Sequence, residues 1–153
     1  IDMALSLVEK TYGPQLAAQV ARYLVVYLRR DGTESQTSVY LEYRTHLHPG
    51  VHLVQDYLCQ NPAKKIYLTR LAKLAAMSPR GLTKAFKKHT GLTPLSYQRM
   101  VRFELATHLM KDSRLTLETI AERCGFEDAR HFRRLWNMQY GSSPSFARNF
   151  INR

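Results

Sequence analysis

Two clusters of basic side chains recur at helical spacing in the second half of the chain. The main members of each cluster stand at positions i, i+3, i+4 and i+7, so they share one face of a helix. Arginine can donate to both acceptors of a guanine, asparagine can pair similarly with adenine, and basic side chains at the margins suit phosphates. The clusters therefore predict recognition of duplex DNA. Their members are Arg80, Thr83, Lys84 and Lys87 with Lys88 beside them, and Arg130, Arg133, Arg134 and Asn137.

The ordinary alternative is a solvated basic face, where most surface lysines and arginines lie. A single cluster would favour that alternative. Two clusters at repeated positions, each behind a repeated apolar pattern, favour binding instead. His131 lies within the second cluster, and we expect it either to contact a phosphate or simply to lie on the surface.

The distribution of charge also indicates a polyanionic partner. The 153 residues carry a formal net charge of +11, and the isoelectric point is about 10.0. Residues 1–61 hold five basic and six acidic residues, whereas residues 62–153 hold eighteen and six, so the whole excess lies in the second part. A domain that repels itself this strongly usually binds a polyanion.

Composition excludes several other classes of protein. A hydrophobic content of 44% and a charged content of 23% are those of an ordinary globular chain. Cys59 and Cys124 are too far apart for a CxxC motif, which rules out a disulfide framework or a cysteine-rich zinc module. No apolar run approaches the ~18 residues that a bilayer span needs. We therefore expect a cytoplasmic protein with no membrane partner.

The apolar residues that must position the basic faces predict an all-α fold. Upstream of the clusters, helices are expected over residues 1–10, 15–28 and 52–60, with a polar linker between the second and the third. Residues 38–48 allow either a short strand or a helix, because Val39, Leu41 and Tyr43 alternate while Tyr40, Tyr43 and Leu47 keep helical spacing. Further helices are expected over residues 68–75, 79–91, 94–111, 116–125 and 128–141, with a last short one after Ser143 and Pro144.

The two basic segments are copies of one internal repeat. Each copy has a short helix, a tight turn, a basic helix and an exit of the form Gly-x-x-Pro. Two copies are too few for a solenoid, and they predict two helix-turn-helix units joined by the long helix over 94–111. At an offset of 49 and then 50 residues, Leu71 matches Ile120, Ala75 matches Cys124, Leu82 matches Phe132, Lys84 matches Arg134, Phe86 matches Trp136, Gly91 matches Gly141 and Pro94 matches Pro144.

The length of the joining helix suits two successive major grooves. About 18 residues span about 27 Å at ~1.5 Å per residue. With the width of the packed helices, this allows a separation near ~34 Å, one turn of DNA. Both basic helices are therefore expected to enter the duplex from one side, and the duplex must bend where its axis cannot follow them.

The stretch LAKLAAMSPRGLTKAFKKHTGLTPLSY and the later TLETIAERCGFEDARHFRRLWNMQYGSSPSF resemble the double helix-turn-helix domain of AraC/XylS-type transcription regulators. The resemblance covers about residues 50–151. It implies sequence-specific binding to promoter DNA, activation of transcription and recruitment of RNA polymerase. It also places base-reading residues at Arg80, Thr83 and Lys84 in the first unit, and at Ala129, Arg130, Arg133 and Arg134 in the second. Of these, Ala129 offers only an apolar contact, such as one with a thymine methyl.

The first unit departs from the family pattern at three positions. Ala76 stands where the turn often has glycine, and a left-handed alanine costs about 1 kcal/mol. Tyr67 replaces the usual serine or threonine cap, and Gly81 lies inside the basic helix, each again at a cost of ~1 kcal/mol. We therefore expect the first unit to be the softer of the two.

Residues 1–30 resemble the last helices of a class I glutamine amidotransferase-like, ThiJ/PfpI-type sensor domain. The expected organisation is thus a truncated sensor domain over 1–30, a linker over 31–49, and a DNA-binding domain over 50–151. Within that domain, residues 50–93 form the first unit, 94–111 the linker helix and 112–151 the second unit. The resemblance implies that the missing sensor domain binds a small-molecule effector, and we expect the full-length protein to be a homodimer.

Other functions have weaker support in the sequence. Neither cysteine lies on a strand-to-helix elbow, and no nucleophile motif is present, so we expect no catalytic residue, no enzyme activity and no cofactor. His46, His48 and His52 are close in sequence but lack a fourth ligand, so no metal site is expected. A non-specific architectural protein or a single-strand RNA binder would need exposed aromatics or an arm. An enzyme with an appended DNA-binding domain would show turnover in the full-length protein.

Overall fold

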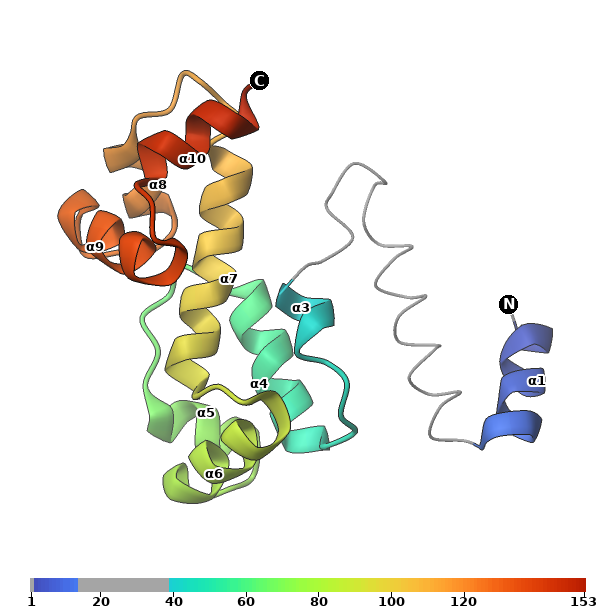
Figure 1. Ribbon diagram of the computed structural model, residues 1–153. Helices are drawn as coiled ribbons and strands as arrows, with labels where there is room; N and C mark the ends of the chain where they lie inside the picture. Colours follow the sequence, from blue (N-terminus) through green and yellow to red (C-terminus); the bar gives the residue numbers. More distant parts are fainter. Residues whose placement is uncertain (1, 14–38) are drawn as a thin grey trace.

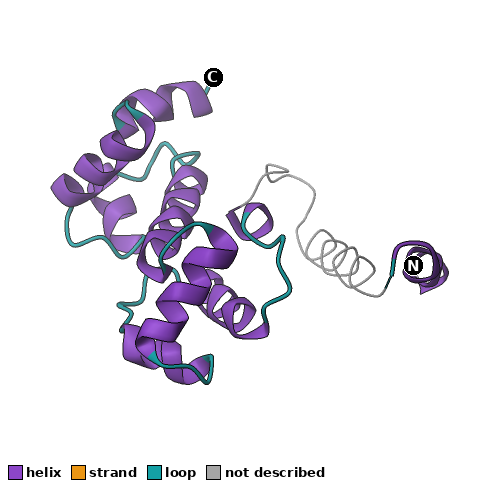
Figure 2. Ribbon diagram, turned by 60° about the horizontal axis from the view of Figure 1, so that its bottom comes forward, coloured by secondary structure: helices purple, strands orange, loops and turns teal. Residues whose placement is uncertain are grey.

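A computed structural model describes residues 2–13 and 39–153 of the chain. Every element in these residues is a helix, which confirms the all-α expectation (Figures 1 and 2). Helix α1 covers part of the predicted sensor tail, whereas the helix expected over 15–28 lies outside the described residues. The helices are α1 (Asp2–Tyr12), α3 (Val39–Glu42), α4 (Pro49–Gln60), α5 (Leu68–Leu74), α6 (Pro79–Thr90), α7 (Pro94–Leu109), α8 (Leu117–Arg123), α9 (Ala129–Tyr140) and α10 (Pro144–Ile151).

Helix α7 carries one helix-turn-helix unit at each end (Figure 1). Its first half packs with α4, α5 and α6 around a core that includes Leu58, Leu71 and Phe86. Its second half packs with α8, α9 and α10 around a core that includes Ile120, Phe132 and Trp136. The fold therefore has two small hydrophobic cores in series, and one helix contributes side chains to both.

The buried face of α7 differs from the single stripe that the sequence suggests. Tyr97 and Val101 are buried as expected, but Leu105 and Leu109 of the same stripe are only half-buried. The second core instead receives Phe103, Ala106 and Met110, which have no exposed surface. The reason is that the two units pack against different faces of the helix, so the buried side changes direction between Val101 and Phe103.

Part of the expected linker over 31–49 packs against the first unit. The segment that allowed strand or helix begins as helix α3, and Val39 belongs to the first core. The backbone N–H of Val39 donates to Glu104 Oε2 at 3.0 Å, which attaches α3 to α7. Arg44 binds both carboxylate oxygens of Asp56 on α4, at 2.6 and 3.2 Å. Residues 31–38 lie outside the described part.

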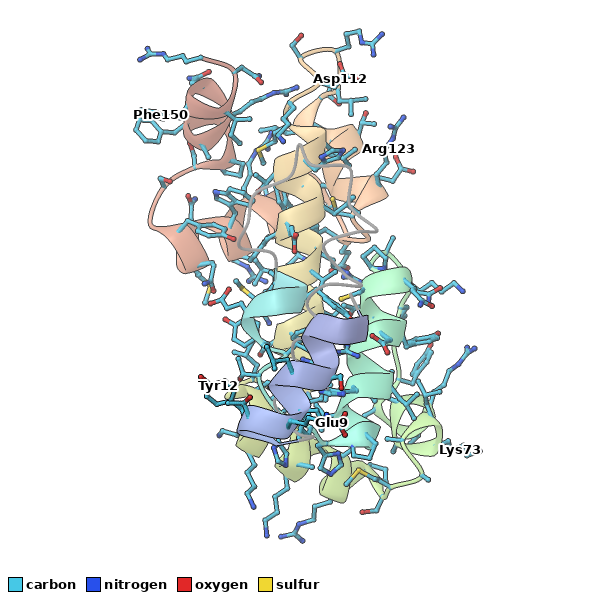
Figure 3. All side chains as sticks on the ribbon, turned by 90° about the vertical axis from the view of Figure 1, so that its right-hand side faces the viewer. Glu9, Tyr12, Lys73, Asp112, Arg123 and Phe150 are labelled. Carbon is cyan, nitrogen blue, oxygen red and sulfur yellow. The ribbon has the colours of Figure 1, made fainter. Side chains whose placement is uncertain are left out.

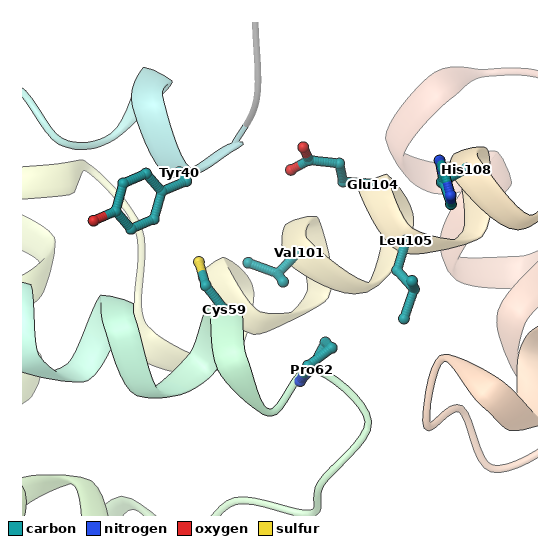
Figure 4. Close-up of a pocket in the computed structure, with 7 residues that line it drawn as sticks. All are labelled: Tyr40, Cys59, Pro62, Val101, Glu104, Leu105 and His108. Atoms are coloured by element: carbon teal, nitrogen blue, oxygen red, sulfur yellow. The ribbon is translucent and has the colours of Figure 1, made fainter. Parts of the chain in front are cut away.

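A small pocket of about 180 Å³ remains between α3, α4 and α7 (Figure 4). Two of its polar groups already have partners, since the Tyr40 hydroxyl bonds to Asp56 at 3.1 Å and the Cys59 thiol to Tyr97 at 3.4 Å. The lining residues are Tyr40, Cys59, Pro62, Val101, Glu104, Leu105 and His108.

A loop of the first unit connects the two halves of the molecule. The carbonyls of Pro62 and Lys64 accept hydrogen bonds from Gln98 and Arg102 of α7, at distances between 2.8 and 3.3 Å. Between them, the backbone of Ala63 lies against the turn of the second unit, where a Cβ on Gly125 would clash with the Ala63 carbonyl oxygen. We call residues 62–64 the bridging loop.

Candidate nucleic-acid interface

The turns of the two helix-turn-helix units have the same hydrogen bonding. In the first, the Met77 N–H donates to the Ala72 carbonyl at 2.9 Å, and in the second the Phe126 N–H donates to Ala121 at 3.0 Å. Both bonds close the six-residue ring of a Schellman motif, which requires a left-handed residue next to the helix end. That residue is Ala76 with φ 53° in the first unit and Gly125 with φ 80° in the second. Ala76 is thus left-handed, as the comparison with the family pattern leads us to expect.

The start and the end of each basic helix are fixed by its own sequence. Ser78 caps α6 by accepting from Gly81 N–H at 3.0 Å, and Asp128 caps α9 by accepting from His131 N–H at 2.6 Å. Both helices end in a left-handed glycine, and a serine or threonine cap with a proline then starts the next helix. These local signals fix which side chains of α6 and α9 face outward.

Most of the predicted DNA-contacting side chains are exposed to solvent. Each basic helix buries only two side chains, Leu82 and Phe86 in α6 and Phe132 and Trp136 in α9. The outer faces therefore project from the body of their units. The exposed members of the predicted set are Arg80, Lys84, Lys87, Lys88, Arg130, Arg133, Arg134 and Asn137.

Three predicted residues are only half-buried and have more limited reach. The Thr83 hydroxyl donates to the Pro79 carbonyl of its own helix at 3.0 Å, so its oxygen remains available as an acceptor. Ala129 opens α9 and partly packs on the second core. His131 packs its ring against Phe126, with centroids 6.2 Å apart, and its buried Nδ1 has no hydrogen-bond partner among the described residues. The expected phosphate contact of His131 stays a prediction.

One predicted base-reading residue has an acidic partner that the sequence analysis missed. The Nη2 of Arg133 donates to Glu118 Oε1 at 2.9 Å, and both side chains are largely exposed. Among the residues that the structure describes, Arg133 is the one member of the two basic clusters in an ion pair. The two residues are 15 positions apart, so helical spacing within one segment gave no signal. Only the packing of α8 across α9 brings them together.

Three further basic residues of the two units lie outside the two predicted clusters. Lys73 and Arg123, in the last turns of α5 and α8, extend into solvent at one edge of the molecule (Figure 3). Arg102 is partly buried between the bridging loop and Phe126, with its guanidinium 5.7 Å from the ring centroid, and burial lowers its pKa. Sequence reasoning assigned no role to Arg102, because nothing local distinguishes it from a surface cation.

The cysteines and histidines show no sign of reactive chemistry within the described residues. Burial raises the pKa of Cys59 to about 11 and that of Cys124 to about 12, so both remain protonated thiols, and neither forms a disulfide. No three histidine, cysteine or acidic side chains of the described part are placed to share a metal ion. In the same residues, no helix combines the length and apolar character of a membrane span.

Comparisons with known proteins agree with this geometry. Residues 71–149 match the family model of a helix-turn-helix domain. Over 121 residues the chain is 32% identical to the HTH-type transcriptional activator RhaS of Salmonella schwarzengrund (strain CVM19633), covering 79% of this chain and 41% of that protein. A probable AraC family transcriptional regulator from Rhodopseudomonas palustris CGA009 superposes with a TM-score of 0.61 at 28% identity, covering 68% of this chain and 98% of that one. The chain belongs to the AraC/XylS family of transcription regulators.

A second similar solved structure contains bound DNA. The DNA-binding domain of AdpA, in complex with a target DNA, matches with a TM-score of 0.61 and 28% identity, over 66% of this chain and 91% of that domain. The chain spans about two fifths of the length of the curated relatives quoted, 41% for RhaS. The likeness therefore concerns the double helix-turn-helix part of the family.

Proposed function

We propose that this chain binds promoter DNA by inserting α6 and α9 into successive major grooves of one duplex. The observation that supports this most directly is the pair of exposed cationic faces, each on a helix-turn-helix with the same turn, cap and exit. Arg80, Thr83, Lys84, Arg130 and Arg134 would read bases, together with Ala129 and Arg133. Lys87, Lys88, His131 and Asn137 would lie nearer the phosphates or at the ends of the reading faces.

We further propose that the domain belongs to a transcription activator, since RhaS is named as one. RNA polymerase would then be its second macromolecular partner, in the cytoplasm. Residues 1–30 would end a sensor domain that binds a small effector, residues 31–49 would connect it to the DNA-binding domain of residues 50–151, and the full-length protein would form a homodimer. The role is one of binding rather than of catalysis.

Selection of binding sites from a random duplex pool tests the proposal. We expect an enriched sequence with two sub-sites, one for each unit, about one helical turn apart. The logarithm of the affinity should fall with the logarithm of the salt concentration, with a slope of roughly −0.9 for each phosphate neutralised. An unenriched pool, or binding that excess random duplex abolishes, would instead indicate a non-specific DNA binder.

Substitutions at Arg134 distinguish base reading from simple charge. Arg134→Ala should cost about 1–3 kcal/mol of binding free energy and relax the preference at one base pair. Arg134→Lys keeps the charge but not the two-pronged donor, so it should lose most of that preference while retaining affinity for random DNA. Equal losses on all sequences for Arg134→Ala would assign the side chain to a phosphate. Titration of labelled duplexes by fluorescence anisotropy measures both quantities.

A further inference from the structure

We infer that Glu118 of α8 is a specificity-determining residue, which orients the guanidinium of Arg133 for a guanine in the second sub-site. This inference rests on the proposed function, because it assigns a role within the DNA-reading face of α9. The observation that carries it is the contact of 2.9 Å between Arg133 Nη2 and Glu118 Oε1.

The acidic side chain of this pair is itself held in place. Glu118 is the second residue of α8, which Thr116 caps by accepting from Thr119 N–H at 3.1 Å. At that position the free N–H groups of the helix start favour a carboxylate. The pKa of Glu118 is lowered, first by a hydrogen bond from its own backbone N–H and then by Arg133, so the side chain is ionised at neutral pH. The start of α8 thus stabilises a negative charge beside Arg133.

The ion pair between Arg133 and Glu118 is not explained by a contribution to the stability of the fold. The side chains of Arg133 and Glu118 are 46% and 64% exposed, and exposed ion pairs contribute little to folding. An acidic residue near a DNA-reading face also opposes the approach of the phosphates. The pair is therefore better explained by an effect on Arg133 than by an effect on the fold.

The geometry leaves Arg133 able to read a base. A guanidinium has five N–H donors, and the bond to Glu118 engages Nη2 alone, so enough donors remain for the two acceptors of guanine. A free arginine side chain loses rotamer entropy when it binds, and a side chain that is already oriented loses less. Arg130 and Arg134 have no such partner among the residues that the structure describes, so Arg133 should be the best ordered of the three.

Two opposite effects on binding follow from removing the Glu118 charge. Glu118→Gln should increase the affinity for random duplex by about two- to fivefold, because one negative charge leaves the neighbourhood of the phosphates. It should also lower the preference for the base pair that Arg133 reads by roughly three- to tenfold, part of the full value of a two-pronged contact. A merely structural role for Glu118 would weaken binding to all sequences alike.

The test compares four variants of the whole chain on the selected site, on its single base-pair substitutions and on random duplex. Arg133→Ala identifies the base pair, Glu118→Gln tests the inference, and the double variant should lose no more preference than Arg133→Ala alone. Glu122→Gln is the matched control, since Glu122 is an exposed acidic residue of the same helix with no ion pair in the described part. It should leave the preference unchanged.

Several results would overturn the inference while the proposed function stands. One is a Glu118→Gln variant that keeps the wild-type preference at the base pair that Arg133→Ala relaxes. Another is an Arg133→Ala variant that keeps every preference, because Glu118 would then hold Arg133 away from the bases. A wild-type chain that selects no sequence would remove the proposed function itself, and the inference with it. Circular dichroism of each variant verifies that the helices remain folded.

Discussion

At the scale of single residues, the two equivalent left-handed positions, Ala76 and Gly125, differ in the space available for a side chain. Ala76 adopts φ 53° in an exposed turn, so its cost is conformational only. Gly125 adopts φ 80° and also faces the bridging loop, where an added Cβ would clash with the backbone of Ala63. The family motif accounts for the conformation at Gly125, but only the tertiary structure accounts for its missing side chain.

We expect Gly125→Ala to destabilise the chain more than the same change at Gly141. Gly141 has φ 69° with nothing within 4 Å of an added Cβ, so Gly141→Ala should cost only about 1 kcal/mol of unfolding free energy. Gly125→Ala adds a clash with backbone, for a total of roughly 2–4 kcal/mol. Urea denaturation of both variants measures the difference. Equal losses would show that the Ala63 contact is easily displaced.

At the scale of elements, the two helix-turn-helix units have the same fold, but the first has more local features that lower its stability. Helix α5 has Tyr67 at its N-cap position and so lacks a side-chain cap, whereas Thr116 caps α8. The first unit also carries the left-handed Ala76, and a glycine inside its basic helix. Each difference costs on the order of 1 kcal/mol in the first unit.

Amide hydrogen exchange should therefore be faster in the first unit. We expect lower protection over residues 66–90 than over 115–140 when exchange is followed by mass spectrometry on the whole chain. The variant Tyr67→Ser supplies the missing cap and should raise protection in the first unit alone. Faster exchange over 115–140 in the wild type would contradict the expected order of stability.

A group of four histidines joins the segment before α4 to α4 and the end of α6 in the first unit. The ring centroid of His46 lies 4.5 Å from that of His52 and 5.3 Å from that of His89. The ring centroids of His48 and His89 are 5.0 Å apart. The pKa of His46 is lowered to about 4, mainly by burial and then by the neighbouring His89, Arg44 and His48, while Gln55 opposes the shift. His46 is thus neutral in the folded protein at pH 7.

Acid should destabilise the first unit through His46. Its pKa is depressed in the folded state, so between about pH 6.5 and pH 4 the unfolded chain binds more protons and the unfolding free energy falls as the pH falls. The loss should reach roughly 1–3 kcal/mol over that window. Urea denaturation at several pH values measures it, with His46→Gln as the variant that should flatten the slope. The same slope in both proteins would show that other groups cause the acid sensitivity.

Local signals in the sequence account for most elements of the fold. The cap signals at Thr93, Thr116 and Ser143, with the glycine exits, predicted where several helices of the two units begin and end, because the bonds they form join residues three or four positions apart. The outward faces of α6 and α9 follow from the same periodicity. Residues 38–48 stayed ambiguous, since a helix of four residues has little periodicity of its own.

Contacts between distant residues could not be predicted in the same way. The partnership of Glu118 with Arg133 and the burial of Phe103 in the second core depend on how separate helices cross. The hydrogen bond from Arg102 to the Pro62 carbonyl of the bridging loop joins residues 40 positions apart. In each case a single sequence shows the residue types but not the partner.

At the scale of the whole molecule, α7 and the bridging loop set the distance between the two reading helices. The helix is continuous from Pro94 to Leu109, and Gln98 and Arg102 bind the loop that also touches the turn of the second unit. The two units are therefore held by a helix and by a second connection beside it.

One base pair inserted between the two sub-sites should weaken binding by at least about tenfold. The insertion moves the second sub-site by about 3.4 Å and turns it by about 35° around the duplex, which a rigid α7 cannot follow. Arg102→Ala loosens the bridging loop and should reduce this penalty, whereas Lys111→Ala, an exposed cation just beyond α7, should not. Gel-shift titration of spacing variants gives the affinities. Equal binding to both spacings would mean that the units reorient freely.

The contact between Gly125 and Ala63 has a consequence for how promoters and regulator change together. A promoter can exchange single bases and lose affinity in small steps, which a substitution on α6 or α9 can restore. A deletion or insertion between its two sub-sites changes a distance that α7 and the bridging loop fix, and a substitution on α6 or α9 cannot restore the match. The binding sites of this protein should therefore differ from one another mainly by base substitutions and hardly at all in the spacing between their two sub-sites.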